Sequence, residues 1–187
     1  MSKQGNVDRI WEIIENVGVC MLATQRAGRL RARPMEPRPD RKRGLIFAVT
    51  DADSAKLDEI ETRPDIGLIF AKAKAYLSIT GRACVTRDIS KMKEIWRPTD
   101  AAWWPGGPTD PNVRLLRIEP LTAELWDGPA STAVRQGLGD RRGAQTRREP
   151  QGDRWHVSAV AFNIPAPGVR TLDAPVLCHT SARVGAP

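Results

Sequence analysis

The sequence predicts a mainly β protein of the α+β class, in which six or seven strands form an antiparallel barrel with short flanking helices. Three observations carry this prediction: the number of strand-like apolar runs, the tight turns that join several of them, and the shortness of the helical patterns between them. Together they favour an antiparallel barrel over a parallel α/β sheet. With 187 residues, 41% of them hydrophobic, the chain can bury one core.

The first elements are a helix and a hairpin. Apolar residues spaced by three and four positions, after a possible cap at Asn6, predict an amphipathic helix; they are Val7, Ile10, Trp11, Ile14 and Val17. The runs Val17–Thr24 and Leu30–Pro37 flank the turn residue Gly28 and predict a β-hairpin. Pro34 and Pro37 place its second strand at a sheet edge or a bulge.

The next segments alternate between strands and short helices. After a polar loop at Arg38–Arg43, the run Gly44–Val49 predicts a buried strand, and Ser54–Glu61 predicts a helix that ends before Pro64. Strands follow at Ile66–Ala71 and Ala75–Thr86.

The last elements of the predicted domain are a helix, an irregular segment and two strands. Ser90–Trp96 has a helical apolar face, and Val113–Ile118 and Leu121–Trp126 read as strands. Residues 101–111 hold three prolines and two glycines, so we expect no regular structure there.

Composition changes near Gly128 and Pro129. Residues 129–187 hold eight arginines and four acidic residues, a net charge of +4, which leaves +3 of the total +7 for residues 1–128. All lysines lie at or before Lys93. We therefore expect a folded domain at residues 1–132 and a disordered, Arg/Pro-rich tail at residues 133–187.

Composition also excludes several classes of protein. No apolar run approaches the ~18 residues that span a membrane, and no secretory signal opens the chain, so we expect a cytoplasmic protein without a membrane partner. Three widely spaced cysteines predict neither a disulfide framework nor a metal site. Residues 1–128 contain no histidine, which argues against a hydrolytic triad. The common nucleotide loops are missing as well, so any reaction should depend on a bound cofactor.

One segment, Thr50–Lys56, is typical of an anion site. It leaves a strand and enters a helix at Ser54, where free backbone N–H groups, two hydroxyls and the charge of Lys56 would suit a phosphate. The alternative is that Ser54 only caps the helix and Lys56 is solvated, and Asp51 and Asp53 oppose an anion nearby.

Two further features are candidates for the same site. Arg31 and Arg33 could supply a second cation, or be plain exposed charges of a strand. The loop Trp103–Gly107 offers flat apolar surface to a ring or a partner subunit, and ordinary core filling explains it equally well.

Five segments of the chain form a recognisable series: Arg31–Met35, Gly44–Thr50, Asp53–Lys56, Tyr76–Arg82 and Trp103–Gly107. In this order and spacing they resemble the general stress protein branch of the pyridoxamine 5′-phosphate oxidase-like FMN-binding split barrels. The resemblance spans about residues 5–128. It implies a six-stranded antiparallel split β-barrel, a homodimer, and FMN bound at the dimer interface.

The resemblance also implies roles for single residues. Arg33, Ser54 and Lys56 match positions that hold the FMN phosphate, whereas Ala55 stands where the oxidases often have arginine. The positions that match flavin-ring contacts are Pro34, Met35, Val49 and Thr50. Tyr76 occupies the position at which the family has a flavin-contacting glutamine from the second subunit. We add Trp104 as a candidate ring contact.

The function implied is that of an FMN-binding, stress-related flavoprotein, an oxidoreductase that uses a small-molecule electron donor or acceptor. One alternative is a flavin carrier or sensor without turnover. Another is pyridoxamine 5′-phosphate oxidase, although Arg154–His156 matches its substrate-binding Arg-x-His pair only superficially. Nucleic-acid binding by the tail is a third and is not expected.

The tail carries a separate hypothesis. Family members typically end in a segment like Gly-Glu-Asn-Arg-Lys-Val-Thr, and codons for it, read two bases later, encode Arg-Glu-Pro-Gln-Gly-Asp. That string stands at Arg148–Asp153. We therefore hypothesise a frameshift after about residues 132–137, which the nucleotide sequence would test.

Overall fold

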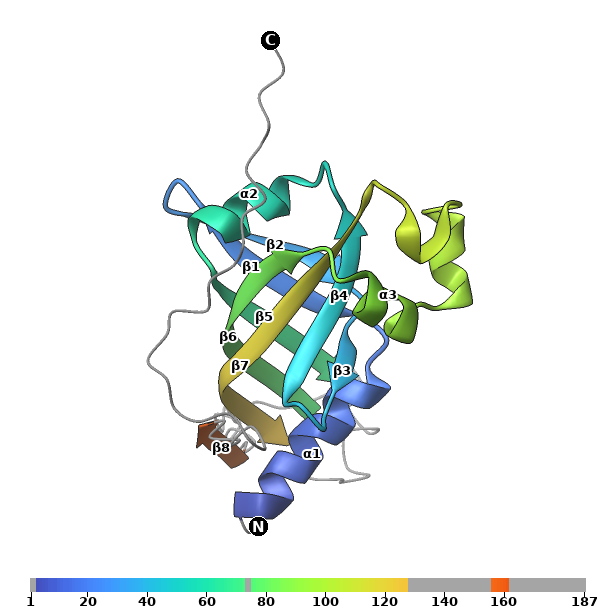
Figure 1. The fold of residues 1–187 in the computed structure, drawn as a ribbon. Coiled ribbons are helices and arrows are strands. Elements are labelled where there is room, and N and C mark those ends of the chain that lie inside the picture. The colour runs from blue at the N-terminus through green and yellow to red at the C-terminus, as the bar shows by residue number, and fades with distance from the viewer. Residues whose placement is uncertain (1–2, 73–74, 128–155, 162–187) are drawn as a thin grey trace, which may run out of the picture.

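A computed structural model describes residues 3–72, 75–127 and 156–161, and Figure 1 shows their arrangement. The described strands form one antiparallel sheet in the order β2-β1-β5-β6-β7-β4-β3, with β8 paired to β7. The strands are β1 (Cys20–Arg26), β2 (Arg29–Met35), β3 (Arg38–Asp40), β4 (Leu45–Asp51), β5 (Asp65–Lys72), β6 (Ala75–Thr86), β7 (Val113–Asp127) and β8 (His156–Ala161). The helices are α1 (Lys3–Asn16), α2 (Ala55–Thr62) and α3 (Ile89–Ile95), with 3-10 helices η1 (Pro98–Ala102) and η2 (Gly107–Thr109). The predicted mainly β class with antiparallel pairing is confirmed.

The predicted number of six strands is wrong, because two more segments join the sheet. The polar loop forms β3, which pairs Arg38 with Phe47 and Asp40 with Leu45. Pro39 lies in β3 without harm because this strand is an edge, where no neighbour needs its missing N–H. Among the described strands the sheet is open, with β2 and β3 at its two ends.

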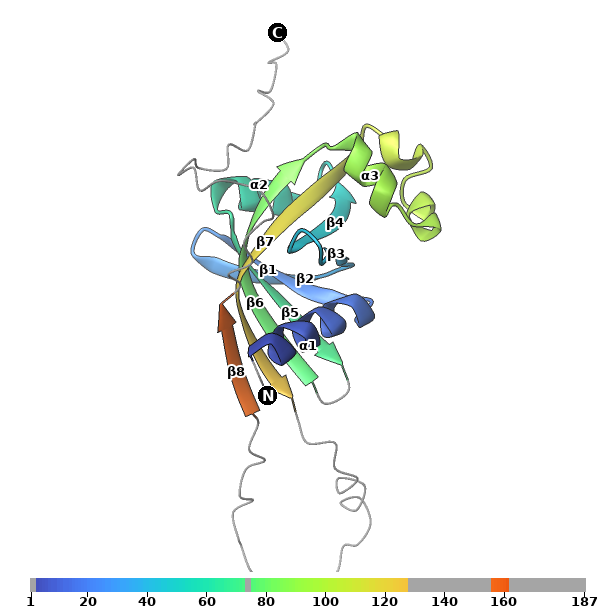
Figure 2. The same ribbon diagram turned by 60° about the horizontal axis from the view of Figure 1, so that its bottom comes forward.

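Strand β8 lies inside the segment predicted as a disordered tail. It pairs with Thr122–Asp127 of β7, as Figure 2 shows. The rest of that predicted tail lies outside the described residues, and so does Arg148–Asp153, on which the frameshift hypothesis rests.

The two last predicted strands are one strand with an irregularity in its middle. Gly81 of β6 pairs with Pro120 and Thr80 pairs with Thr122, so Leu121 is an extra residue on β7. A Cβ on Gly81 would lie 2.6 Å from the carbonyl oxygen of Glu119. Glycine therefore lets β6 pass close to the bulge.

The predicted hairpin is confirmed, with Ala27 and Gly28 as its turn. Both residues have positive φ, 48° and 77°, which a tight two-residue turn requires and which glycine adopts without strain. The register pairs Leu22 with Arg33 and Thr24 with Arg31. Because paired residues share a face of the sheet, both arginines lie on the same face as buried Leu22 and Thr24.

The sheet has apolar side chains on both faces at β4. Ile46 and Ala48 face the main core, to which α1 contributes Ile10, Trp11 and Ile14. Figure 2 shows the helix α1 lying against the sheet. Leu45 and Phe47 alternate with them and face a second cluster with Met92 of α3, Val113 and Leu115. Burial on both faces explains why Gly44–Val49 is apolar without alternation.

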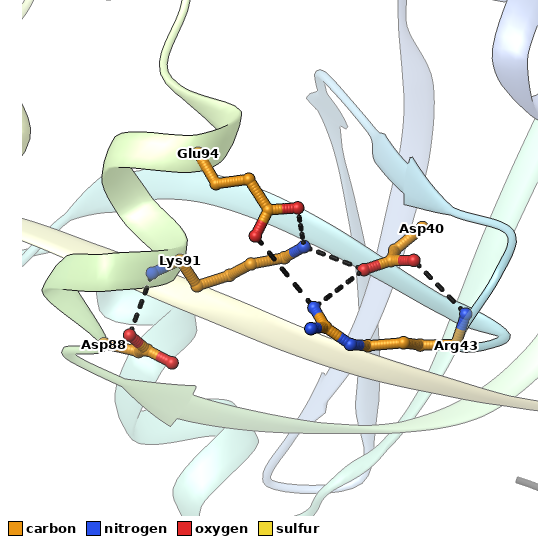
Figure 3. Close-up of polar contacts among 5 residues, drawn as sticks. All are labelled: Asp40, Arg43, Asp88, Lys91 and Glu94. Atoms are coloured by element: carbon orange, nitrogen blue, oxygen red, sulfur yellow. Dashed lines mark hydrogen bonds and ion pairs between the residues drawn. The ribbon is translucent and has the colours of Figure 1, made fainter. Parts of the chain in front are cut away.

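A buried lysine fixes α3 against the β3–β4 turn, as Figure 3 shows. The Nζ atom of Lys91 donates to Asp40 at 2.8 Å and to Glu94 at 2.7 Å, and it lies 4.8 Å from the ring centre of Phe47. Arg43 donates to Asp40 as well. Burial opposes the charge of Lys91, but its hydrogen bonds with Asp40 and Glu94 outweigh that effect and raise its pKa. The hydrogen bonds of Lys91 therefore hold α3, the helix that precedes the loop Trp103–Gly107.

Within the described ranges, the structure contains no helix with the length and apolar character needed to cross a membrane.

Candidate functional site

The predicted anion segment forms a connected cluster where β4 passes into α2. The Nζ atom of Lys56 donates to Thr50 Oγ1 at 2.7 Å and to Ser54 Oγ at 2.6 Å. Ser54 is the residue before α2, yet its side chain makes no capping hydrogen bond. The cap interpretation therefore does not account for its hydroxyl, which is occupied by Lys56.

Lys56 is half-buried and lies near a second cation. Burial lowers its pKa first, and the charge of Arg33 lowers it further, whereas Asp51 and Glu59 act in the opposite direction. Both leading causes destabilise the positive charge of the lysine. An anion placed between Lys56 and Arg33 would relieve them.

The guanidinium of Arg33 is bound by the carboxylate of Glu59, which the sequence analysis missed. Glu59 Oε2 accepts from Arg33 Nη2 at 2.7 Å and from Thr24 Oγ1 at 2.6 Å, and Oε1 accepts from Arg31 Nη1 at 3.3 Å. The Glu59 side chain has no exposed surface. Burial alone would raise its pKa, but the hydrogen bonds from Thr24, Arg33 and Arg31 outweigh burial and lower it to about 2. Glu59 is therefore ionised at neutral pH.

A signal for Glu59 was present in the sequence. It lies three residues after Lys56, so one helix face carries both side chains, and its neighbours Leu57 and Ile60 are core residues. An acidic residue on the apolar side of a short helix needs a cationic partner, and in the structure the arginines of β2 supply it.

Arg33 keeps one donor that no described atom accepts. Its Nη2 atom binds Glu59, whereas Nη1 is buried and has no hydrogen-bond partner among the described residues. Buried guanidinium N–H groups are rarely left unpaired, because each loses its water without compensation. This spare donor belongs to a guanidinium whose charge also acts on Lys56, and the two cations together would suit an oxyanion such as a phosphate.

The acidic residues near the cluster are exposed. The side chain of Asp51 accepts from the backbone N–H of Asp53 at 3.0 Å, within its own turn. Asp51 still acts on Lys56 electrostatically, since it raises the pKa of that lysine. Its effect is smaller than those of burial and Arg33.

The hydrogen bonds described for this cluster do not involve the remaining predicted site residues. Pro34 is exposed and Met35 is buried in the main core at the end of β2. Val49 and Trp104 pack on the second cluster, where the rings of Trp104 and Trp96 are 6.3 Å apart, and the Trp104 Nε1 atom is buried without a described partner. Packing in the apolar core therefore accounts for much of the position of the Trp104 side chain.

Two predicted aromatic surfaces are exposed. Tyr76 on β6 is 43% exposed, opposite Ala71 and Trp126, and Trp103 is 79% exposed in the loop between η1 and η2. In the described part of the chain, no three His, Cys, Asp or Glu side chains are grouped so that they could hold a metal ion.

The fold and the site define an antiparallel β-sheet protein with a cationic cluster formed by residues of β2, of β4 and of the start of α2. Comparison with known families gives the rest. The chain matches the model described as "Pyridoxamine 5'-phosphate oxidase like" over residues 5–150, and it belongs to that family.

Relatives agree with the general stress protein branch that the sequence analysis identified. General stress protein 26 of Bacillus subtilis (strain 168) is 26% identical over 140 residues, which cover 72% of this chain and 97% of that protein. The crystal structure of the general stress FMN/FAD binding protein of Xanthomonas citri has a TM-score of 0.64 and 25% identity, covering 75% of this chain and 99% of that one. General Stress Protein 26 of Bacillus anthracis shares the fold, with a TM-score of 0.59 and 23% identity over 64% of this chain and 92% of that one.

Proposed function

We propose that this protein binds FMN, with the phosphate of the cofactor between Arg33 and Lys56. The observation that carries the proposal is the buried Nη1 atom of Arg33, which has no partner among the described residues, in a guanidinium whose charge also acts on Lys56. Family membership and the flavin-binding relative from Xanthomonas citri support it. Thr50 and Ser54 would hold Lys56 in place, as they do in the described structure.

The flavin ring would then lie along β2 and the end of β4. In this proposal the backbone at Pro34, Met35, Val49 and Thr50 borders the ring on one side. Tyr76 would reach it from a second copy of the chain, and Trp104 would close the site from the loop. When bound, FMN supplies electron transfer, and the protein binds and orients it.

A homodimer is part of the same proposal. Met21 of β1 and Ile69 of β5 are cross-strand neighbours, and they are 37% and 46% exposed on the outer face of the sheet. With Val19 and Tyr76 they give that face an apolar character that a second copy would cover. We also propose that the open, curved sheet is the split barrel of this family.

The reaction we propose is that of an oxidoreductase with a small-molecule electron donor or acceptor. A flavin carrier or sensor is the second candidate, since the cluster described here would suit an anion and, as described, includes no group that would act on a substrate. A turnover assay distinguishes these two functions. If a nicotinamide cofactor reduces the bound flavin and an added acceptor reoxidises it, in catalytic amounts, the protein is an enzyme. Pyridoxamine 5′-phosphate as the electron donor would indicate the vitamin-making oxidase.

The binding of FMN itself is tested by an absorption spectrum of the purified protein with and without added FMN, together with its thermal stability and its mass by light scattering. We expect bound flavin absorbance, a dimer, and about 2.7 kcal/mol of stabilisation at a hundred times the Kd. A monomer without flavin absorbance or thermal shift would contradict the proposal.

A further inference from the structure

The buried carboxylate of Glu59 has no role in the proposed function so far. It bridges α2 to β1 and β2 through Thr24 and Arg33, directly behind the proposed phosphate site. We propose that Glu59 is a positioning residue for the anion: it holds one edge of the Arg33 guanidinium so that the other edge, Nη1, stays turned to the ligand phosphate. This inference rests on the proposed binding of FMN.

The geometry of Arg33 leads to this assignment. A guanidinium group is planar and rigid, so fixing Nη2 also fixes the direction of Nη1. Nη2 is fixed by the bond of 2.7 Å to Glu59, while Nη1 has no described acceptor. Thr24 donates to the same Oε2 atom at 2.6 Å and so ties the carboxylate to β1.

Arg31 does not share this role. Its side chain is 55% exposed and its bond to Glu59 is longer, 3.3 Å, whereas the Arg33 side chain is 22% exposed. Exposed ion pairs contribute little because water and salt screen them. Glu59 therefore acts on the site through Arg33.

Charge alone predicts the opposite effect of Glu59. A carboxylate behind the site repels a phosphate, so removing its charge would strengthen FMN binding if electrostatics dominated. Positioning predicts weaker binding, because a loosened guanidinium has to be ordered again when the ligand binds. The sign of the change thus separates the two explanations.

The first experiment compares Glu59→Gln with the wild type, using FMN and riboflavin as probes and flavin fluorescence as the signal. Glutamine keeps the size of the side chain but offers one acceptor oxygen in place of two. We expect FMN to bind about ten-fold more weakly, which is the lower end for one charge-assisted contact, and riboflavin to change less than two-fold. The matched control is Glu61→Gln, an exposed acidic residue of the same helix, which should bind both flavins like the wild type.

The second experiment places Glu59→Gln in an Arg33→Ala background. If Glu59 acts through Arg33, the double variant should bind FMN as weakly as Arg33→Ala alone, so the two effects are not additive. Additive losses would overturn the positioning role.

A third variant leaves the buried carboxylate intact in case Glu59→Gln fails to fold. Arg33→Lys keeps the charge, but an ammonium lacks the fork that would bridge Glu59 and a phosphate at fixed geometry. We expect it to lose at least ten-fold in FMN affinity while riboflavin binding is kept.

The outcomes also separate this inference from the proposed function. Wild-type protein that binds neither flavin overturns both. Wild-type protein that binds FMN overturns only the role of Glu59 if Glu59→Gln binds FMN unchanged or more tightly, if both flavins weaken alike, or if Arg33→Lys binds FMN normally.

Discussion

Two clusters of charged side chains, each built around one buried charge, differ in whether all their buried polar atoms have partners. Around Lys91, two cations, Lys91 and Arg43, face two carboxylates, Asp40 and Glu94, and no polar side-chain atom of these four is buried without a partner (Figure 3). Around Glu59, one buried carboxylate binds Arg33 and acts electrostatically on Lys56, and within the described ranges Arg33 Nη1 has no partner. The charges of the Lys91 cluster are balanced, and this cluster joins secondary structure elements. The Glu59 cluster has surplus positive charge and a spare hydrogen-bond donor.

The difference shows why an unpaired donor has to be considered together with charge. Arg38 also has buried donors, Nε and Nη1, for which the described part of the chain offers no partner. However, its guanidinium already lies 2.9 Å from Asp100 and 2.8 Å from Glu36, so its positive charge is compensated twice. A further anion would be repelled there, while the cluster around Arg33 and Lys56 would gain from one.

We expect the largest effect on stability when the charge balance of the Lys91 cluster is broken. Lys91→Ala leaves Asp40 without its buried partner, so we expect a loss of about 3–5 kcal/mol in the free energy of unfolding. Urea unfolding followed by circular dichroism measures it. Lys93→Ala, an exposed lysine on the same helix, should change stability by less than about 0.5 kcal/mol. Similar values for both variants would show that the Lys91 network is not structural.

The second prediction concerns pH and Glu59. Its pKa is lowered from 4.5 to about 2 in the folded protein, so its stabilisation is present above pH 4.5 and is lost as the pH falls toward 2. The shift corresponds to about 3 kcal/mol. Glu59→Gln lacks this contribution, so the stability gap between wild type and variant should narrow between pH 5 and pH 2. A gap that stays constant over that range would show that Glu59 is not held ionised by its partners.

The third prediction tests Lys56 as a ligand of the phosphate. Lys56→Ala removes one charge-assisted contact worth about 1.5–3 kcal/mol, so FMN should bind about ten-fold to a hundred-fold more weakly. Riboflavin carries the same ring without the phosphate and should be little affected. Trp104→Ala, if the indole meets the ring, should weaken both flavins alike. Equal losses for the two flavins in Lys56→Ala would mean that Lys56 acts through the fold.

Much of the fold could be predicted because local patterns agree with tertiary structure. The spacing of Ile10, Trp11 and Ile14 gave α1, and the turn at Gly28 gave the hairpin. Strand β3 could not be predicted, because Arg38–Asp40 is polar and contains proline, and only pairing with β4 makes it a strand. Pro120 made one long strand look like two, since the bulge opposite Gly81 depends on β6.

The site could be predicted only in part, for the same reason. Thr50, Ser54 and Lys56 lie within one short segment, and the structure brings them together as expected. Arg33 joins them through Glu59, which is 26 residues away in sequence. That contact follows from the packing of α2 against β1 and β2, which no local pattern encodes. The contacts described for this cluster do not involve Tyr76 or Trp104, so their roles stay predictions.

The smallest expected effect distinguishes the two arginines of β2. Arg31 and Arg33 lie on the same face and both contact Glu59, so sequence alone gives no order between them. The Arg31 side chain is 55% exposed, and exposed ion pairs contribute about 0–1 kcal/mol, so Arg31→Ala should weaken FMN binding by no more than about five-fold. Arg33→Ala should weaken FMN binding by at least ten-fold.

Salt sharpens this last comparison. The Debye length falls from about 10 Å at 0.1 M salt to about 3 Å at 1 M, so an exposed charge is screened while a buried contact is not. The effect of Arg31→Ala on FMN affinity should therefore vanish at high salt, whereas the effect of Arg33→Ala should persist. The measurement is FMN titration of both variants at the two salt concentrations. If Arg31→Ala lost as much affinity as Arg33→Ala at both, the phosphate would be held at the exposed edge of β2, and the unpaired Nη1 atom of Arg33 would need another explanation.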